Sequence, residues 1–400
     1  MRAQGQNIDI RGAGFSVIRK LGLAKAVRNS TTGEEGAKFV DEHNVVWGAF
    51  GADKSGKVQT GTSDIEILRG TLVDILYQRC KDISEGVRRR GGAGADFVFG
   101  DLVQDIDQEG TQVAVTFAKS GRKQSFDFVI GADGLQSQTR KLVWGAKGEN
   151  DRVKPLHAYG AFWSMPAAPT DSLWRRWFHA PGRKSIMVRP SETPNRSTVF
   201  MTVYDEHNPR LVEVATFGHQ GVKAQKALLR ELFEGEGWEC ERILNEMDAA
   251  DDFYYDVIAQ VHMPDKIWHK GHVALLGDAG YCGSPFSGMG TTLALVGAYN
   301  LAGSLVQHSR EPDRAFTAYE QRMRPLVEAA QKLPPGLPKW LFSQTVWGLV
   351  VFRWVMWVLW RSGVAYLLAR WKGPPADAVG LEEFGFTEVQ EWEGREGKRS

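Results

Sequence analysis

The fold is decided by a stretch of nineteen residues, which reads His272-Val273-Ala274-Leu275-Leu276-Gly277-Asp278-Ala279-Gly280-Tyr281-Cys282-Gly283-Ser284-Pro285-Phe286-Ser287-Gly288-Met289-Gly290. The apolar run from Val273 to Leu276 predicts a short strand that is buried on both faces. A carboxylate, Asp278, follows at the carboxyl end of this strand. A Pro-x-x-Gly-x-Gly turn comes next, and the apolar run from Thr291 to about Leu305 then predicts a helix.

This order of elements predicts a ligand site. Open α/β sheets bind ligands at the carboxyl ends of their strands, and glycines let the backbone come close to a ligand. The start of a helix supplies free N–H groups and the positive end of the helix dipole. Asp278 is placed to accept two hydroxyl hydrogen bonds from a ribose or ribityl chain. A plain structural turn is the alternative that this stretch alone leaves open.

A second stretch repeats the same order of elements earlier in the chain. It reads Phe126-Asp127-Phe128-Val129-Ile130-Gly131-Ala132-Asp133-Gly134-Leu135-Gln136-Ser137-Gln138-Thr139-Arg140. The pattern again predicts a strand, a Gly/Asp turn and the start of a helix. Two such stretches in one chain favour a ligand site over two unrelated structural turns.

Together, the patterns G-A-D-G-x-x-S-x-x-R and G-D-A-x(6)-P-x-x-G-x-G resemble the two downstream fingerprints of the flavin-dependent aromatic hydroxylases. These enzymes are single-component monooxygenases that contain FAD. The residues from Ser284 to Thr292 look closest to the tetracycline-inactivating branch and its fungal relatives. The resemblance covers about residues 2 to 332.

The resemblance implies an α/β fold, with a Rossmann-like FAD-binding domain, an antiparallel-sheet substrate domain and a C-terminal helix. It also implies FAD as cofactor and NAD(P)H as co-substrate. In this family NAD(P)H reduces the flavin, O₂ adds to form a C4a-hydroperoxide, and its terminal oxygen passes to an electron-rich carbon or a ketone. The substrate is expected to be hydrophobic, aromatic or polycyclic. Because the cofactor performs the chemistry, no catalytic acid, base, nucleophile or metal ligand is expected.

The resemblance also assigns cofactor contacts. Asp9 and Arg69 are expected to contact FAD, and Asp278 to hold its ribityl or pyrophosphate region. The backbone from Gly288 to Thr291 is expected against the pyrimidine end of the ring, where a helix start stabilises negative charge. Asp133 is expected as a structural acid next to the cofactor, and Arg2 stands where the branch has its nicotinamide-cofactor arginine. The full expected set is Arg2, Asp9, Arg69, Asp133, Asp278, Pro285, Gly288, Met289, Gly290 and Thr291.

The first segment departs from the family pattern. The residues from Ile8 to Val17 read as a strand, a G-x-G-x-x-V turn and a helix, with Glu34 and Glu35 further on, which mimics a dinucleotide fingerprint. We reject that interpretation because Val17 replaces the third glycine, which permits close packing of helix and strand. In the family a segment like this one follows the first βαβ unit, which carries the true G-x-G-x-x-G. We therefore expect this unit to be missing here.

The composition is that of an ordinary soluble globular protein of two to three domains. Of the 400 residues, 42% are hydrophobic and 24% are charged. A net charge of +1 argues against nucleic acid as a partner. The three cysteines, Cys80, Cys240 and Cys282, lack disulfide or metal-ligand spacing. The first residues lack the apolar core of a signal peptide, so a cytoplasmic location is expected.

Changes in residue pattern predict the domain boundaries. The expected parts are 1–155 (first part of the FAD-binding domain), 156–264 (substrate-binding sheet), 265–333 (second part of the FAD-binding domain), 334–372 (hydrophobic helix region) and 373–400 (disordered tail). The sheet region is rich in aromatic residues, namely Phe162, Trp163, Trp174, Trp177 and Phe178. These side chains are either substrate-lining or ordinary sheet core.

The segment from Val346 to Trp360 is almost wholly apolar, with Arg353 at its centre. It is marginal as a membrane span, which needs about 20 apolar residues. Three alternatives remain: a bracing helix packed across both domains, a helix lying in a membrane interface, and a true span. Peripheral membrane contact through 340–371 is therefore retained.

The sequence favours an FAD-dependent monooxygenase acting on a small hydrophobic molecule with O₂. Two other functions remain open. A reductase or halogenase of the same architecture would share these motifs. A flavin-free protein held at a membrane or partner surface would follow if the first unit is truly absent.

Overall fold

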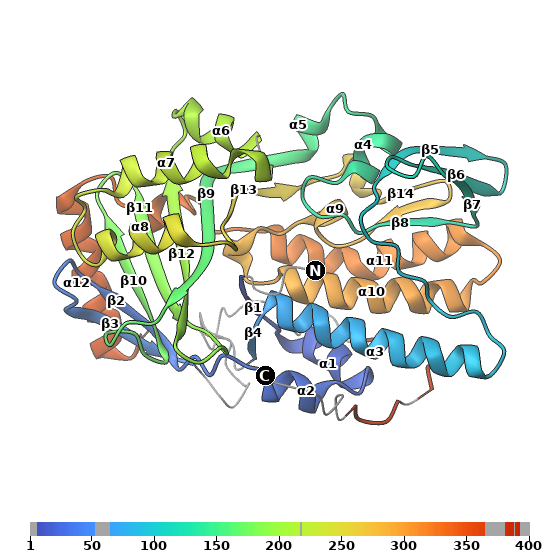
Figure 1. Cartoon of the computed structure of the whole chain (residues 1–400), viewed down its shortest axis with the longest axis horizontal. Coiled ribbons are helices and arrows are strands. Elements are labelled where there is room, and N and C mark those ends of the chain that lie inside the picture. The colour runs from blue at the N-terminus through green and yellow to red at the C-terminus, as the bar shows by residue number, and fades with distance from the viewer. Residues whose placement is uncertain (1–5, 53–64, 217, 365–380, 388, 393–400) are drawn as a thin grey trace.

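The computed structural model describes residues 6–52, 65–216, 218–364, 381–387 and 389–392. It consists of two halves that lie side by side (Figure 1). One half is mostly helical and surrounds a small, partly parallel sheet. The other half is a large, mostly antiparallel sheet with helices on one face. The expected α/β fold, with a cofactor domain and an antiparallel-sheet domain, is confirmed.

The small sheet carries both glycine-rich turns. Its strand order is β14-β15-β8, and β15 runs parallel to β8. The side chains from Val273 to Leu275 have no exposed surface, as expected for a strand covered on both faces. The bounds in this sheet are β8 Val129–Gly131, β14 His269–Lys270 and β15 Val273–Leu275.

Helices pack around this sheet and begin or end near its strand ends. The helix expected after the Asp278 turn is confirmed as α10, and α11 follows it. The bounds are α1 Gly12–Lys20, α2 Ala24–Asn29, α3 Arg69–Arg89, α4 Gln138–Trp144, α5 Glu149–Arg152, α9 Asp278–Tyr281, α10 Gly290–Gln307 and α11 Pro312–Gln331. A ribbon of β1 Asn7–Asp9 with β4 Glu66–Leu68 leads into α1 and α3.

Gly14 in the first segment serves helix packing. A Cβ atom at Gly14 would lie 2.9 Å from Oγ1 of Thr292, so α1 and α10 cross in close contact at this point. The Arg11 amide donates to the same Thr292 hydroxyl over 3.2 Å, and this ties the start of α1 to the first turn of α10. Gly14 is therefore explained by a helix crossing, in agreement with rejecting the dinucleotide fingerprint.

The large sheet has seven strands in the order β13-β9-β12-β11-β10-β2-β3. All neighbours are antiparallel except β10 and β2. The bounds are β2 Gly36–Val40, β3 Val46–Gly51, β9 Val153–Pro166, β10 Trp174–Ala180, β11 Lys184–Pro190, β12 Arg196–Tyr204 and β13 Tyr254–Val261. β2 and β3 come from the stretch that we assigned to the cofactor domain. That assignment is corrected, because these strands extend the sheet edge through the long-range pairing of β2 with β10.

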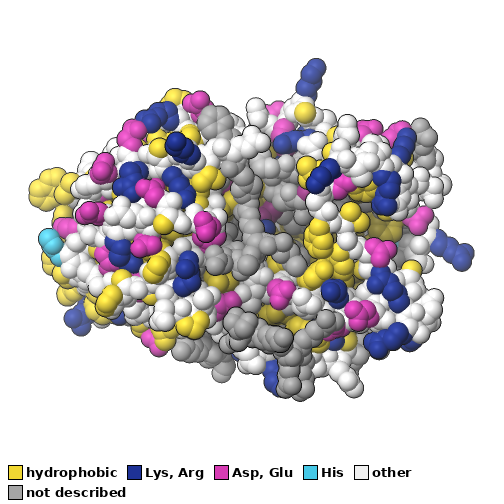
Figure 2. Space-filling view, in the orientation of Figure 1, with side chains coloured by type: hydrophobic (Ala, Val, Ile, Leu, Met, Phe, Trp, Pro, Cys, Tyr) yellow, Lys and Arg dark blue, Asp and Glu magenta, His cyan; other side chains and the backbone are white. Residues whose placement is uncertain are grey.

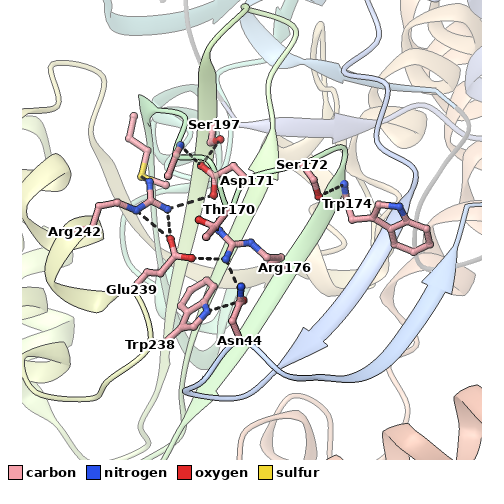
Figure 3. Close-up of polar contacts among 12 residues, drawn as sticks. Asn44, Thr170, Asp171, Ser172, Trp174, Arg176, Ser197, Trp238, Glu239 and Arg242 are labelled. Carbon is pink, nitrogen blue, oxygen red and sulfur yellow. Dashed lines mark hydrogen bonds and ion pairs between the residues drawn. The ribbon is translucent and has the colours of Figure 1, made fainter.

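Helices α6 (Pro209–Thr216), α7 (Val222–Phe233) and α8 (Cys240–Ala249) cover one face of this sheet. Figure 3 shows a charge network that connects the sheet to helix α8 of this layer. Arg176 of β10 pairs with Asp171 and with Glu239, and Asp171 and Glu239 also pair with Arg242. The other elements are β5 Val103–Glu109, β6 Gln112–Phe117, β7 Lys123–Phe126 and the short helices η1 Gly218–Gly221, η2 Pro264–Lys266, η3 Pro285–Ser287 and η4 Lys339–Leu341.

The apolar C-terminal segment forms α12 (Val346–Ser362), which lies on the far edge of the large sheet (Figure 1). Phe352 packs edge-to-face on Phe39 of β2 with ring centres 5.7 Å apart, and Gly48 of β3 leaves room for Met356. α12 packs mainly against β3 and β10 of the large sheet. Of the three alternatives for this segment, the helix packed across both domains is therefore corrected to a helix packed on the sheet. Within the described part of the chain, no helix combines the length and the hydropathy that crossing a bilayer requires.

Part of the expected disordered tail packs on the helical half. Residues 381–387 and 389–392, called here the C-terminal strap, lie across helices that surround the small sheet. Phe384 is 8% exposed and covers Gly303 of α10, where a Cβ atom would lie 2.3 Å from its ring. Trp392 donates its backbone N–H to the carbonyl of Gly22 over 2.7 Å. The tail prediction is corrected for these residues, because aromatic side chains anchor an otherwise acidic segment.

Replacing Phe384 with alanine is expected to destabilise the protein by about 3 kcal/mol, because it removes a buried aromatic ring from a fitted site. The matched control is Val389→Ala on the same strap, since Val389 is 40% exposed. Thermal unfolding monitored by circular dichroism measures both changes. Equal effects of the two substitutions would contradict the packed position of the strap.

Acid is expected to destabilise the contact between α12 and the sheet through His179. Burial lowers the pKa of His179 to about 3, so the unfolded chain takes up a proton below pH ~6.5 that the folded chain does not. The stability present above pH ~6.5 is lost as the pH falls, by on the order of 2 kcal/mol near pH 4.5. Urea unfolding of the native protein and of the His179→Phe variant, each above pH ~6.5 and near pH 4.5, checks this expectation. The variant is expected to lose less stability in acid, and parallel losses would refute the assignment.

Candidate functional site

A cavity of about 1120 Å³ lies between the two halves. It exceeds the ~300–1,000 Å³ that is usual for small-molecule sites, so it has room for more than one ligand. The helical half contributes the starts of three helices, at Arg11, Arg69 and Gly290. The large sheet contributes the face opposite to α6–α8, and α12 closes one side.

Most of the residues expected at a cofactor site line this cavity. They are Asp9, Arg69, Asp278, Pro285, Gly288, Gly290 and Thr291. Met289 has a fully buried side chain within the core of the helical half. Arg2 lies outside the described residues.

The Asp278 turn has the geometry of an anion and hydroxyl site. Asp278 is exposed towards the cavity as the first residue of α9. Gly288 has φ +61°, a conformation that side chains rarely adopt, and α10 begins two residues later. The free N–H groups of such a helix start favour negative charge. The carboxylate and the helix start together fit a cofactor with hydroxyl groups and an anionic ring or phosphate.

Arg11 is a site residue that sequence reasoning missed. Its side chain is 5% exposed and pairs with Asp9, with Nη2 and Oδ2 2.8 Å apart. It also lies next to the Asp278 turn, because a Cβ atom at Gly288 would be 3.7 Å from its Nε atom. An arginine directly after a short strand and before a helix was the available signal.

Asp133 holds its own turn together. It accepts hydrogen bonds from the hydroxyl of Ser137 and from the backbone and hydroxyl of Thr139, at 2.5, 2.8 and 3.0 Å. Its neighbours Ala132 and Gly134 line the cavity, whereas Asp133 does not. Asp133 therefore stabilises the turn, and its neighbours Ala132 and Gly134 are the residues that face the cavity.

Arg140 connects the two motifs. It has no exposed surface and donates to the carbonyl of Ala279 over 2.6 Å and to that of Leu135 over 2.7 Å. It also forms an ion pair with Glu149. Ala279 follows Asp278 directly, so this guanidinium fixes the two glycine-rich turns relative to each other.

The sheet side of the cavity is aromatic. Of the five aromatic residues singled out in the sequence, Phe162 and Trp177 line it. Trp163 and Phe178 point to the opposite face and are core, because neighbouring strand residues alternate between faces. The other aromatic lining residues are Phe39, Phe50, Phe200, Phe286, Phe342 and Trp360.

Two arginines in this aromatic wall belong to a buried charge cluster. Glu34 pairs with Arg175 and Arg189, and Arg189 also pairs with Glu66. Burial acts to raise the pKa of Glu34, but the two guanidiniums outweigh it and keep that pKa below its usual value. Burial raises the pKa of Glu66 to about 7. The cluster places two guanidiniums, with their paired carboxylates, in the wall of an otherwise apolar chamber.

Comparisons with known proteins match this geometry. The family model described as "FAD binding domain" matches residues 10–227. Monooxygenase CTB7 of Cercospora beticola is 34% identical over 92% of this chain and 86% of its own length. FAD-dependent monooxygenase asL6 of Sarocladium schorii is also 34% identical, over 84% and 78% of the two chains. The crystal structure of tetracycline destructase Tet(51) has a TM-score of 0.71 and 31% identity, covering 96% of this chain and 90% of that one.

Arg140→Met is expected to destabilise the protein by about 3 kcal/mol, because it leaves two buried carbonyls without their donor and Glu149 with only the longer ion pair to Arg152. The control is Arg210→Met, which breaks the ion pair with Glu231 on the exposed surface and should leave stability unchanged. Urea unfolding followed by fluorescence measures both. If the two variants unfold alike, Arg140 does not hold the turns.

Proposed function

The chain belongs to the family of FAD-dependent monooxygenases, and from that membership we propose that it uses NAD(P)H and O₂ to oxidise a hydrophobic small molecule. The proposed reaction is hydroxylation, with epoxidation and Baeyer–Villiger oxidation as the other forms of oxygen transfer. The observation that carries the proposal is that one cavity joins the Asp278 turn on one side to an aromatic wall on the other.

When bound, FAD supplies the redox chemistry: two electrons come from NAD(P)H, and one atom of O₂ goes to the substrate and the other to water. The protein's own residues bind and orient. Asp278 is proposed to accept hydrogen bonds from the ribityl or pyrophosphate region. Asp9 and Arg69 are proposed as further cofactor contacts. The backbone from Gly288 to Thr291, with Pro285 shaping its approach, is proposed to stabilise negative charge on the ring.

Asp133, Arg2 and the two halves of the protein also have proposed roles. Asp133 is proposed to position the backbone of its turn beside the cofactor, through its bonds to Ser137 and Thr139. Arg2 remains a proposed contact of the nicotinamide cofactor. The helical half is proposed as the FAD-binding domain and the large sheet as the substrate domain.

An aromatic or polycyclic substrate is proposed because flat rings can stack on the wall formed by Phe162, Trp177 and Phe200. Apolar walls also exclude water from the reacting atoms. Arg175 and Arg189 are proposed to bind oxygen substituents of such a ring system. The likeness to a tetracycline destructase supports a polycyclic substrate class. Peripheral membrane contact through 340–371 is proposed as well, independently of the reaction.

The test is the visible absorption spectrum of the purified 1–400 chain after incubation with FAD and desalting. Retained flavin bands, followed by substrate-stimulated oxidation of NAD(P)H, are the expected result. Asp278→Asn is expected to weaken FAD binding about tenfold, because it removes a charged acceptor. Asp127→Asn, which alters an exposed carboxylate in the bend before β8, is the matched control.

A colourless protein after incubation would overturn the proposal for this chain. Flavin binding that is equally strong in Asp278→Asn and in the native protein would remove Asp278 from the cofactor site. Flavin that stays bound but is never reduced by NADPH or NADH would point to a different electron donor.

A further inference from the structure

The side of α12 that faces away from the protein is an apolar stripe. Trp347, Val351, Trp354, Val355 and Val358 follow one another at helical spacing, and each is between 46% and 80% exposed. Trp354 lies at the border of this stripe, where it packs edge-to-face on Trp47 of β3 with ring centres 5.5 Å apart. In Figure 2, hydrophobic side chains gather at the edge where α12 lies in Figure 1. We call these five residues the outer face of α12. Trp340, in the preceding turn, is 76% exposed and adds to it.

The opposite side of the same helix belongs to the cavity. Leu349 is 3% exposed and packs inward. Leu359 and Trp360 line the cavity, as does Gly363 directly after the helix. The cavity and the outer face therefore lie on opposite sides of the same helix.

The segment that contains α12 carries no acidic residue of its own. From Ala329 to Val364 the chain has no Asp or Glu, although the whole protein carries 48 acidic and 49 basic residues. The charged residues in this stretch are Lys332, Lys339, Arg353 and Arg361. Arg353 forms an ion pair with Glu42 and Lys339 forms one with Glu206, so the basic charge beside the outer face rests on Arg361 and Lys332. Arg361 lies at the end of the outer face, 4.9 Å from the ring centre of Trp360. Basic side chains beside exposed tryptophans match the headgroup region of an anionic membrane.

The dimensions of the stripe argue against a second protein chain as its partner. The helix has 17 residues, so the stripe is roughly 25 Å long and about 10 Å wide. A stable protein interface buries about 800 Å² on each partner. A helix that lies in the plane of a membrane needs only an apolar face with a basic rim.

We propose that the outer face of α12 docks on an anionic membrane surface, which places the wall of the cavity against the lipid. A hydrophobic substrate dissolved in the membrane then reaches the chamber by passing the C-terminal end of one helix, at Leu359, Trp360 and Gly363. This route rests on the proposed function, because it requires a hydrophobic substrate. The docking itself does not.

The experiment is co-sedimentation of the full chain, incubated with FAD, with vesicles of phosphatidylcholine and phosphatidylserine in equal parts. Pure phosphatidylcholine vesicles test the contribution of charge. The variant Trp347→Glu/Val351→Glu places two carboxylates on the outer face. The control is Leu102→Glu/Val306→Glu, because Leu102 (74% exposed) and Val306 (60% exposed) lie on other surfaces.

The native chain and the control are expected to sediment with the mixed vesicles, and less with the neutral ones. The outer-face variant is expected to partition at least about tenfold more weakly, since it loses apolar burial in the interface. Its flavin content should match that of the native protein, because both side chains point away from the cavity.

No sedimentation of the native chain, or equal sedimentation of all three proteins, would overturn the docking. A native dimer that the outer-face variant converts to a monomer, seen by light scattering without vesicle binding, would assign the face to a second copy instead. The flavin spectrum is read separately. Vesicle binding without bound flavin would refute the proposed function but not the docking. Bound flavin without vesicle binding would refute the docking but not the proposed function.

Discussion

The site depends on one buried cation. Arg140 has no exposed surface, and a guanidinium removed from water is tolerated only where acceptors meet its N–H groups. Its acceptors are the carbonyls of Leu135 and Ala279 and the carboxylate of Glu149. The first two belong to glycine-rich turns that are far apart in the sequence, so these turns have only one arrangement that satisfies the cation. The position of Asp278, one residue before Ala279, follows from that arrangement.

A second constraint acts on the large sheet: successive side chains of each strand point to opposite faces. Arg175 and Trp177 point into the cavity, whereas Arg176 and Phe178 point to the helices on the other face. Each face of β10 therefore needs its own counter-charges. Glu34 meets Arg175, and Asp171 and Glu239 meet Arg176 (Figure 3). A shift of one residue in the pairing of β10 would exchange the two sets and leave both arginines buried without partners.

Local patterns could be predicted from the sequence, and long-range pairings could not. The strand–turn–helix units at Asp133 and Asp278 involve neighbouring residues, so their order and their meeting at one cavity could be inferred. The addition of β2 and β3 to the distant sheet depends on pairing between Gly36 and Trp174, which no local signal announces. The docking of Phe384 on Gly303 is equally remote in sequence. The acidic residues around Phe384 suggested disorder because the partner surface cannot be seen from the segment itself.

The sequence of α12 predicts a helix clearly but does not show what the helix packs against. The helix is apolar on nearly all sides, and such a helix is stable in water only if apolar partners cover it. The sheet covers the side of Leu349, Phe352 and Met356, and this contact explains half of the pattern. A helix that only braced the sheet would need polar residues opposite Leu349. Trp347 and Val351 stand there instead, so the outer half of the pattern calls for a second apolar environment. Arg361 at the end of this side, in a segment with no acidic residue between Ala329 and Val364, matches that environment to lipid headgroups.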